Sequence, residues 1–395
     1  IGEVLIEDVL FVLHMSAIGL FFNIISVPYR GFLIAKEKIQ SFAYIDLLSV
    51  FLKLAVAISL ILISENRLVV YALLLMISSL IVAIVYKQFC NKIISESRYI
   101  YNWDKKLFNE LLSFTGWTTI PAISSVFKGQ GTILLLNSFF GPVLNASQGI
   151  ANQVKAGIKT FSLNLLAAFS PQITITYAEK DFKSMKKLVL SGAKITFYIF
   201  LFIFIPVIVE IDYILSLWLI KVPEFASTVV LLVLLDTLVS LMTSTYNIAI
   251  RATGEIKNYE LTINAIHLMG FPISLFLLYM EFGYQAVFIL WIILSIVALF
   301  FECYWLNRLL PFISLKEIYF LNLLKMTLIG ILGMIIPVIV YNLMDQSFLR
   351  LLLVTILSFL SVIISSYFFG STKSEKKQFL RYLDKLSHRF RNLKV

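Results

Sequence analysis

The chain has 395 residues, of which 59% are hydrophobic and 14% charged, and it carries 33 Lys and Arg against 23 Asp and Glu. Soluble domains contain roughly 25% charged and about 45–50% apolar residues, so this composition excludes an ordinary soluble protein. The two cysteines, Cys90 and Cys303, lie far apart without metal-type spacing. Neither a disulfide framework nor a zinc site is therefore predicted.

Eleven apolar stretches are long enough to cross a membrane as helices. Crossing a hydrocarbon core of about 30 Å takes roughly 20 mostly apolar residues in a helix. The stretches are apolar on all sides and do not alternate with period two, which favours helices over barrel strands. In chain order they are 9–28, 41–63, 68–86, 113–139, 145–176, 188–209, 225–250, 258–280, 284–306, 317–341 and 351–370. The sequence predicts an all-α integral membrane protein with about eleven transmembrane helices present.

The basic residues alternate between the segments that connect these stretches. One set of segments carries 24 Lys and Arg: 29–40, 87–110, 177–187, 251–257, 307–316 and 371–395. The opposite set carries 3: 64–67, 140–144, 210–224, 281–283 and 342–350. The positive-inside rule places the first set, and with it the C-terminus, in the cytoplasm. The net charge of +10 is then expected to serve topology and contacts with anionic lipid headgroups, not nucleic acid.

Six lysines fall inside the predicted helices. Lys194 and Lys325 lie within two or three turns of a cytoplasmic helix end, where a long side chain can snorkel to the headgroups. The other four lie near the middle of the membrane: Lys53, Lys128, Lys155 and Lys159. Each costs about 2.5–3.5 kcal/mol when it faces lipid at the bilayer centre. We therefore expect these four to face a hydrated interior.

Polar residues at helical spacing support a polar cavity. In the stretch 145–176 a 3-4-3-4 spacing places five of them on one face: Asn145, Gln148, Asn152, Lys155 and Lys159. In the preceding stretch four residues also share a face: Thr118, Ser125, Lys128 and Thr132. Amides alone could simply join helices by hydrogen bonds. Two lysines on the same stripe favour the cavity.

Three acidic residues inside the predicted helices are candidates for binding a coupling ion: Asp46, Asp236 and Glu302. Asp46 precedes Lys53 by two turns and could instead pair with it. For Asp236 and Glu302, a structural ion pair or a helix-end position is the alternative. His14 and His267 could carry protons, although a single helical histidine is more often a hydrogen-bonded packing residue.

No enzyme motif is present. The sequence contains no Gly-rich phosphate loop and no metal-binding cluster. The longest connecting segment has about 24 residues, which is too short for a soluble catalytic domain. We therefore expect neither enzymatic activity nor a cofactor.

Short motifs after and within the predicted helices suggest a family. They are Val27–Tyr29 leading to Ala35–Glu37, then Phe114–Trp117, Asn137–Gly141, Gln148–Gln153 and Ser170–Gln172. With them the sequence resembles the polysaccharide flippases, the Wzx-type O-antigen transporters of the multidrug/oligosaccharidyl-lipid/polysaccharide superfamily. The resemblance covers nearly the whole chain.

The resemblance implies a two-lobed flippase of fourteen helices, similar to multidrug exporters of that superfamily, with three helices ahead of Ile1. Residues 1–110 would form the rest of an N-terminal lobe and a cytoplasmic linker, and 111–306 a C-terminal lobe of about six helices. Residues 307–370 would add two helices, and 371–395 a basic cytoplasmic tail.

The resemblance also implies a substrate, an undecaprenyl-diphosphate-linked oligosaccharide. The flippase would move it from the inner to the outer leaflet of a bacterial inner membrane for O-antigen, capsule or exopolysaccharide synthesis. Other partners would be membrane lipids, a polysaccharide polymerase and a chain-length regulator. Alternating access would be powered by the membrane potential or an ion gradient. A central cationic cavity would bind the substrate through Lys128, Lys155, Lys159, Lys53, Asn152 and Gln148.

Other functions stay open. A related exporter of lipid-linked peptidoglycan precursor or of small drugs is the nearest alternative, although drug exporters usually favour anionic or aromatic cavities. A membrane glycan polymerase or ligase is a further alternative. Such enzymes typically need a sizeable external loop, and the longest outward segment here, 210–224, has about 15 residues.

Overall fold

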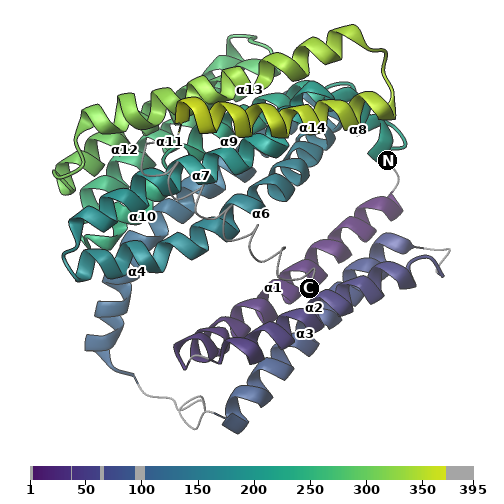
Figure 1. The fold of residues 1–395 in the computed structure, drawn as a ribbon. Helices are drawn as coiled ribbons and strands as arrows, with labels where there is room; N and C mark the ends of the chain where they lie inside the picture. Colours follow the sequence, from purple (N-terminus) through teal and green to yellow (C-terminus); the bar gives the residue numbers. More distant parts are fainter. Residues whose placement is uncertain (1–2, 37, 63–65, 94–102, 371–395) are drawn as a thin grey trace, which may run out of the picture. The chain divides into compact units, whose positions relative to one another are not determined.

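The computed structural model describes residues 3–36, 38–62, 66–93 and 103–370 (Figure 1). These residues form helices joined by short connections, and no strand occurs among them. Nine helical segments of the described chain are long and apolar enough to cross a membrane. The protein is therefore an all-α integral membrane protein, as the sequence predicts.

Two of the eleven predicted stretches are helical but more polar than these nine. The stretch 113–139 falls on α4 (Lys105–Val126), a π-helical segment η2 (Phe127–Gly131) and α5 (Thr132–Phe140), which run end to end. The stretch 145–176 falls within the single helix α6 (Pro142–Ala178). Because these helices contain the lysines and amides discussed above, they are not among the nine apolar segments. The number eleven stays a prediction.

Contacts divide the chain into two units between Phe108 and Asn109. The first unit contains α1 (Glu3–Ala35), α2 (Ile39–Ser59) and α3 (Arg67–Ile93), with α3 packed against both other helices. Its core consists of buried side chains from all three helices: Leu33, Ile45, Val82, Tyr86 and Cys90.

Asp46 has partners other than Lys53, the residue with which the sequence left a pair open. In the first unit, Asp46 Oδ1 accepts a hydrogen bond from Tyr86 Oη at 2.8 Å and lies 3.6 Å from Arg30 Nη2. The Arg30 guanidinium also lies 5.1 Å from the centroid of the Tyr86 ring. Asp46 thus joins α2 to α1 and α3, because both partners approach it from neighbouring helices.

The second unit is built around α7 (Phe182–Val209). Its other helices are α4 to α6 and then α8 (Ile211–Trp218), α9 (Ala226–Leu241), α10 (Ser244–Ala252), α11 (Lys257–Tyr279), α12 (Tyr284–Leu309), α13 (Leu324–Leu343) and α14 (Phe348–Ser365). Short π-helical segments, η3 (Glu317–Leu323) and η4 (Ser366–Gly370), flank α13 and α14. Phe197, Phe200 and Phe204 of α7 are at most 2% exposed, and they form the middle of the core.

The N-terminus of α7 is fixed by a side-chain cap. Asp181 Oδ1 accepts a hydrogen bond from the Ser184 backbone N–H at 3.1 Å, so it satisfies one of the free donors of the first turn. Hydrogen bonds from the Ser184 side chain and backbone hold the pKa of the Asp181 carboxyl below its ordinary value. Asp181 therefore serves to start α7.

A break between α9 and α10 divides one membrane-spanning segment, Ala226–Ala252, into two helices. The break falls at Met242 and Thr243. It leaves Asp236 on α9 and Ser244 on α10, on either side of an interruption in the middle of the unit. Polar side chains on both sides of the break can therefore point into the interior of the second unit.

Helices α13 and α14 run side by side and both pack on α7 (Figure 1). A buried ion pair joins α7 to α14: Arg350 Nε and Nη2 each lie 2.7 Å from a carboxylate oxygen of Glu210. Arg350 Nη1 also donates to the Met344 carbonyl at 2.9 Å, and the guanidinium lies 4.4 Å from the Tyr341 ring centroid. Glu210 is 1% exposed and Arg350 7%. Sequence reasoning had assigned both residues to outer connecting segments.

The prediction that Lys194 snorkels to the headgroups is wrong. Lys194 is only 6% exposed, and its Nζ donates to the carbonyl oxygen of Gly370 at 3.5 Å. Gly370 is the last residue of η4, where helix carbonyls attract a cation. The hydrogen bond joins α7 to the end of η4 at this buried position.

Candidate functional site

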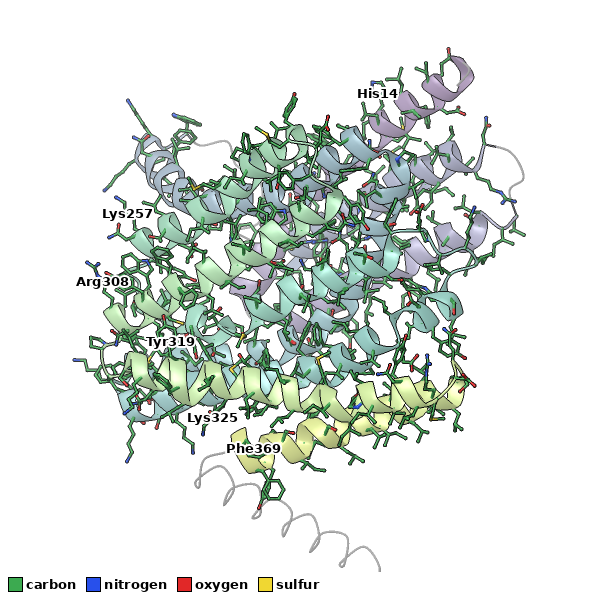
Figure 2. The ribbon with its side chains drawn as sticks, turned by 90° about the horizontal axis from the view of Figure 1, so that it is seen from above. His14, Lys257, Arg308, Tyr319, Lys325 and Phe369 are labelled. Carbon is green, nitrogen blue, oxygen red and sulfur yellow. The ribbon has the colours of Figure 1, made fainter. Side chains whose placement is uncertain are left out.

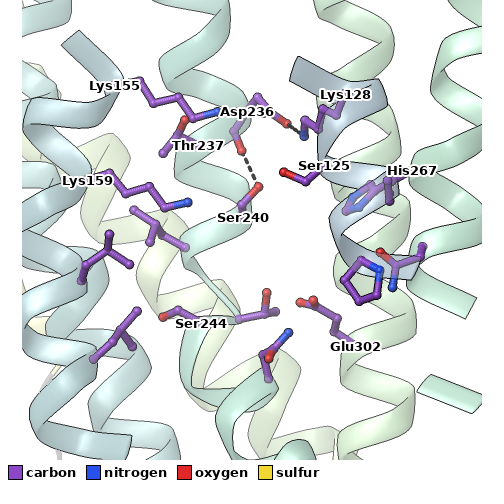
Figure 3. Close-up of a pocket in the computed structure, with 18 residues that line it drawn as sticks. Ser125, Lys128, Lys155, Lys159, Asp236, Thr237, Ser240, Ser244, His267 and Glu302 are labelled. Atoms are coloured by element: carbon purple, nitrogen blue, oxygen red, sulfur yellow. Dashed lines mark hydrogen bonds and ion pairs between the residues drawn. The ribbon is translucent and has the colours of Figure 1, made fainter. Parts of the chain in front are cut away.

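A cavity of about 530 Å³ lies inside the second unit, among α4, α6, α9, α10, α11 and α12. Three of the four predicted mid-membrane lysines line it: Lys128, Lys155 and Lys159. Asp236 and Glu302, two of the predicted ion-coupling residues, line it as well (Figure 3). A second cavity of about 170 Å³ shares Lys128, Lys155 and Asp236 and adds Gln148 and Asn152.

Lys128 and Asp236 form an ion pair in the wall of the cavity. Lys128 Nζ lies 2.9 Å from Asp236 Oδ1 and 3.3 Å from Ser295 Oγ. Ser295 Oγ in turn donates to Asp236 Oδ1 at 2.5 Å. Side-chain exposure is 23% for Lys128 and 8% for Asp236, so the lysine faces the cavity more than the carboxylate does. Asp236 therefore neutralises one of the three lysines, Lys128, from the more buried side of the pair.

The π-helical segment η2 and two close helix contacts position Lys128. A Cβ at Gly131 would lie 2.8 Å from the Phe271 ring, and a Cβ at Gly270 would lie 2.3 Å from the Trp291 ring. Only glycine allows α11 to approach η2 and α12 so closely. Trp291 donates from Nε1 to Thr132 Oγ1 at 3.1 Å, and its ring centroid lies 5.1 Å from Lys128 Nζ. Segments of this π-helical type often occur at functional sites.

Lys155 and Lys159 reach the cavity from one face of α6. Their spacing of four residues places them one turn apart, and Figure 3 shows both extending toward α9. The Lys155 ammonium is attracted by the carboxylate of Asp236 and repelled by the ammonium groups of Lys128 and Lys159. With Asp236 as the one carboxylate that lines this end of the cavity in the described chain, the three lysines give it an excess of two positive charges.

The opposite end of the cavity is acidic and rich in hydrogen-bonding groups. Glu302 Oε1 accepts from Tyr259 Oη at 3.2 Å, and the carboxylate also hydrogen-bonds to Thr243. Asn247 Nδ2 donates to Tyr259 Oη at 2.6 Å. Glu302 is thereby held in place by Tyr259 of α11 and Thr243 of the break before α10, and Asn247 of α10 in turn holds Tyr259.

A second group of contacts extends this network on α11. Arg251 Nη2 lies 2.6 Å from Glu260 Oε1, and Asn264 Nδ2 donates to Glu260 Oε2 at 3.1 Å. Asn264 and His267 line the cavity. Sequence reasoning missed Glu260 and Asn264. Their 4–3 spacing with His267 marks a polar face of α11 by the same criterion that identified the stripe on α6.

Several polar atoms around the cavities have no hydrogen-bond partner among the described residues. They are Ser124 Oγ, Ser244 Oγ and Gln148 Oε1, all of them buried. Buried polar atoms are usually hydrogen-bonded, because leaving one unpaired costs about 1–3 kcal/mol. These atoms can donate to or accept from a polar ligand in the cavities.

The remaining predicted site residues, Lys53 and Asp46, belong to α2 of the first unit. The assignments of Lys53 to the cationic cavity and of Asp46 to ion coupling stay predictions. Among the described residues no group of three or more His, Cys, Asp or Glu could hold a metal ion.

The site is thus an intramembrane cavity with a cationic end, an acidic end and neutral hydrogen-bonding groups between them. Such a cavity can bind an elongated polar molecule that carries an anion at one end. No protein-family model, curated protein or solved structure matches this chain.

Proposed function

We propose that this protein is a flippase of the Wzx type. It moves an undecaprenyl-diphosphate-linked oligosaccharide from the inner to the outer leaflet of the bacterial inner membrane, for O-antigen, capsule or exopolysaccharide synthesis. The observation that supports this is the cavity of about 530 Å³ lined by Lys128, Lys155 and Lys159. A diphosphate is a compact anion, and ammonium groups bind such anions through charge-assisted hydrogen bonds.

In this proposal the two ends of the cavity bind different parts of the substrate. The lysines bind the diphosphate, while Glu302, Asn247 and Asn264 accept and donate hydrogen bonds to sugar hydroxyls. The volume falls within the usual 300–1,000 Å³ of ligand sites. Alternating access is driven by the membrane potential or an ion gradient, with Asp236 or Glu302 taking up the coupling ion.

We also propose that the C-terminus lies in the cytoplasm. The division of 24 against 3 basic residues between alternate connecting segments supports this orientation. A reporter fused within 177–187 is expected to report the cytoplasm, and one within 210–224 the exterior. The reverse pattern of reporter activity would refute the orientation.

Replacement of Lys155 tests the cationic cavity. Lys155→Gln should lower export of surface polysaccharide about tenfold or more, because a charge-assisted hydrogen bond is worth roughly 1.5–3 kcal/mol. Lys155→Arg should retain more activity than Lys155→Gln, because it keeps the charge. The measurement is complementation of a flippase-deficient strain, with protein levels determined by blot.

Lys325→Gln is the matched control, since Lys325 lies on α13 outside the cavity and loses the same charge. It should export polysaccharide at close to the wild-type rate. If Lys155→Gln and Lys159→Gln also export at the wild-type rate, the cationic-cavity mechanism is wrong.

Glu302 favours a second candidate, an exporter of cationic drugs, because its carboxylate lines the same cavity. If Glu302→Gln abolishes drug resistance while the lysine variants have no phenotype, this second candidate replaces the first. An exporter of lipid-linked peptidoglycan precursor would share the cationic cavity and is distinguished by which lipid-linked glycan accumulates in the null strain.

A further inference from the structure

A separate cavity of about 330 Å³ lies where α11 begins and α12 ends. It is lined by Glu255, Lys257, Asn258, Trp305, Arg308 and Leu309. Both helices are membrane-spanning candidates, so their adjoining ends lie at the depth of the lipid headgroups. Figure 2 shows Lys257 and Arg308 at the same edge of the protein, both directed away from the helices.

Contacts on α12 hold the Arg308 guanidinium in place. Arg308 Nη1 donates to Tyr304 Oη at 2.8 Å, and the guanidinium carbon lies 5.1 Å from the Trp305 ring centroid. The guanidinium is therefore held against two aromatic side chains before any ligand binds. Such a planar, pre-organised cation suits the two oxygens of a phosphate group.

Two further donors surround the same cavity. Trp305 is 8% exposed, and its Nε1 has no hydrogen-bond partner in the described part of the chain. The 23-residue helix α11 begins at Lys257 after Ile256, whose side chain makes no cap hydrogen bond. The first-turn N–H groups of α11 therefore carry the partial positive charge of an uncapped helix start. An anion at this position would complement the guanidinium, the indole N–H and the helix start together.

The adjoining surface of α12 matches a lipid better than a free anion. Ile293, Val297, Phe301 and Tyr304 follow one another at helical spacing on the same face as Arg308, and each is 36–50% exposed. This apolar stripe leads from the cavity toward the middle of the span. It provides a surface along which an acyl chain can lie while the headgroup occupies the cavity.

We propose that this cavity is a binding site for the phosphodiester headgroup of an anionic phospholipid. Among the described residues that line the cavity, Lys257 and Arg308 oppose one carboxylate, Glu255, so these residues carry one net positive charge. That charge matches a monoanionic headgroup such as phosphatidylglycerol. The site is distinct from the cavity of the proposed transport function and does not depend on it.

Native mass spectrometry of the full chain in detergent tests the site, with phosphatidylglycerol and phosphatidylcholine titrated separately. Arg308→Gln and Lys257→Gln should each weaken phosphatidylglycerol binding about tenfold, because each removes a charge-assisted hydrogen bond. Trp305→Phe, which keeps the ring and loses the N–H, should weaken it less. Lys316→Gln is the matched control: it loses the same charge from an exposed position outside the cavity, so binding should change less than about twofold.

The competing explanations give different results. Wild-type binding by both Arg308→Gln and Lys257→Gln would overturn the proposal, as would an equally large loss in Lys316→Gln. Equal affinity for phosphatidylcholine would show that headgroup charge is not recognised and would also overturn it. Displacement of the lipid by excess inorganic phosphate would identify a small-anion site instead. If Arg308→Gln fails to fold, Lys257→Gln and Trp305→Phe carry the test.

Discussion

Arg350→Ala is expected to lower the free energy of unfolding by about 3–5 kcal/mol, because it leaves the carboxylate of Glu210 buried without its cation. Glu210 is 1% exposed, and both of its oxygens are bound by Arg350 at 2.7 Å. The loss should be visible as a lower midpoint of unfolding in detergent, followed by size-exclusion chromatography with fluorescence detection.

Two controls separate the buried pair from ordinary surface charge. Glu317→Gln removes a carboxylate that pairs with Lys186 at 2.6 Å but is 26% exposed, so the loss should be about 1 kcal/mol or less. The double variant Glu210→Leu with Arg350→Met removes both charges and should recover most of the stability. If Arg350→Ala unfolds at the wild-type midpoint, the pair does not join α7 to α14 energetically.

Asp236→Asn is expected to tighten binding of inorganic pyrophosphate roughly tenfold while reducing polysaccharide export by about tenfold or more. In the wild-type protein, Asp236 Oδ1 lies 2.9 Å from Lys128 Nζ and competes with any anionic ligand for this lysine. Without its charge, the three lysines attract the diphosphate more strongly and release it more slowly, so binding and turnover change in opposite directions. A tenfold change in the dissociation constant corresponds to about 1.4 kcal/mol of binding free energy.

Binding is measured by calorimetry on the purified protein, and export by complementation. Asp212→Asn is the control, because Asp212 is an exposed aspartate on α8 that does not line the cavity. It should leave both quantities unchanged. Weaker pyrophosphate binding by Asp236→Asn would contradict the competition and would indicate that Asp236 only holds the lysine in place.

Helical spacing predicts much of the cavity from the sequence alone. The stripe of Gln148, Asn152, Lys155 and Lys159 depends only on the period of one helix, and the structure brings these residues to two adjoining cavities. The same polar residues explain why α6 is not among the apolar spans of the structure, although it is a continuous helix.

Pairing between distant helices could not be read from spacing. Lys128 is separated from Asp236 by 108 residues and Arg350 from Glu210 by 140. Only the tertiary fold therefore determines which residues form these ion pairs. Asp46 shows the same limit: the nearest cation along its helix is Lys53, but its partners come from α1 and α3. The burial of Lys194 could not be predicted either, because its hydrogen-bond acceptor, Gly370, lies 176 residues away along the chain.

The length of α6 exceeds the thickness of the membrane. Its 37 residues make a rod of about 55 Å, against a hydrocarbon core of about 30 Å and about 40–45 Å with headgroups. Even a tilt of about 40°, the upper end of what is usual, shortens its projection only to roughly 42 Å. If α6 crosses the membrane, as the sequence predicts, at least one of its ends must therefore lie among the headgroups or in water. Because Lys155 and Lys159 lie between the N-terminal end of α6 and its one internal proline, Pro171, a shift of the N-terminal end would be carried along the helix to both lysines.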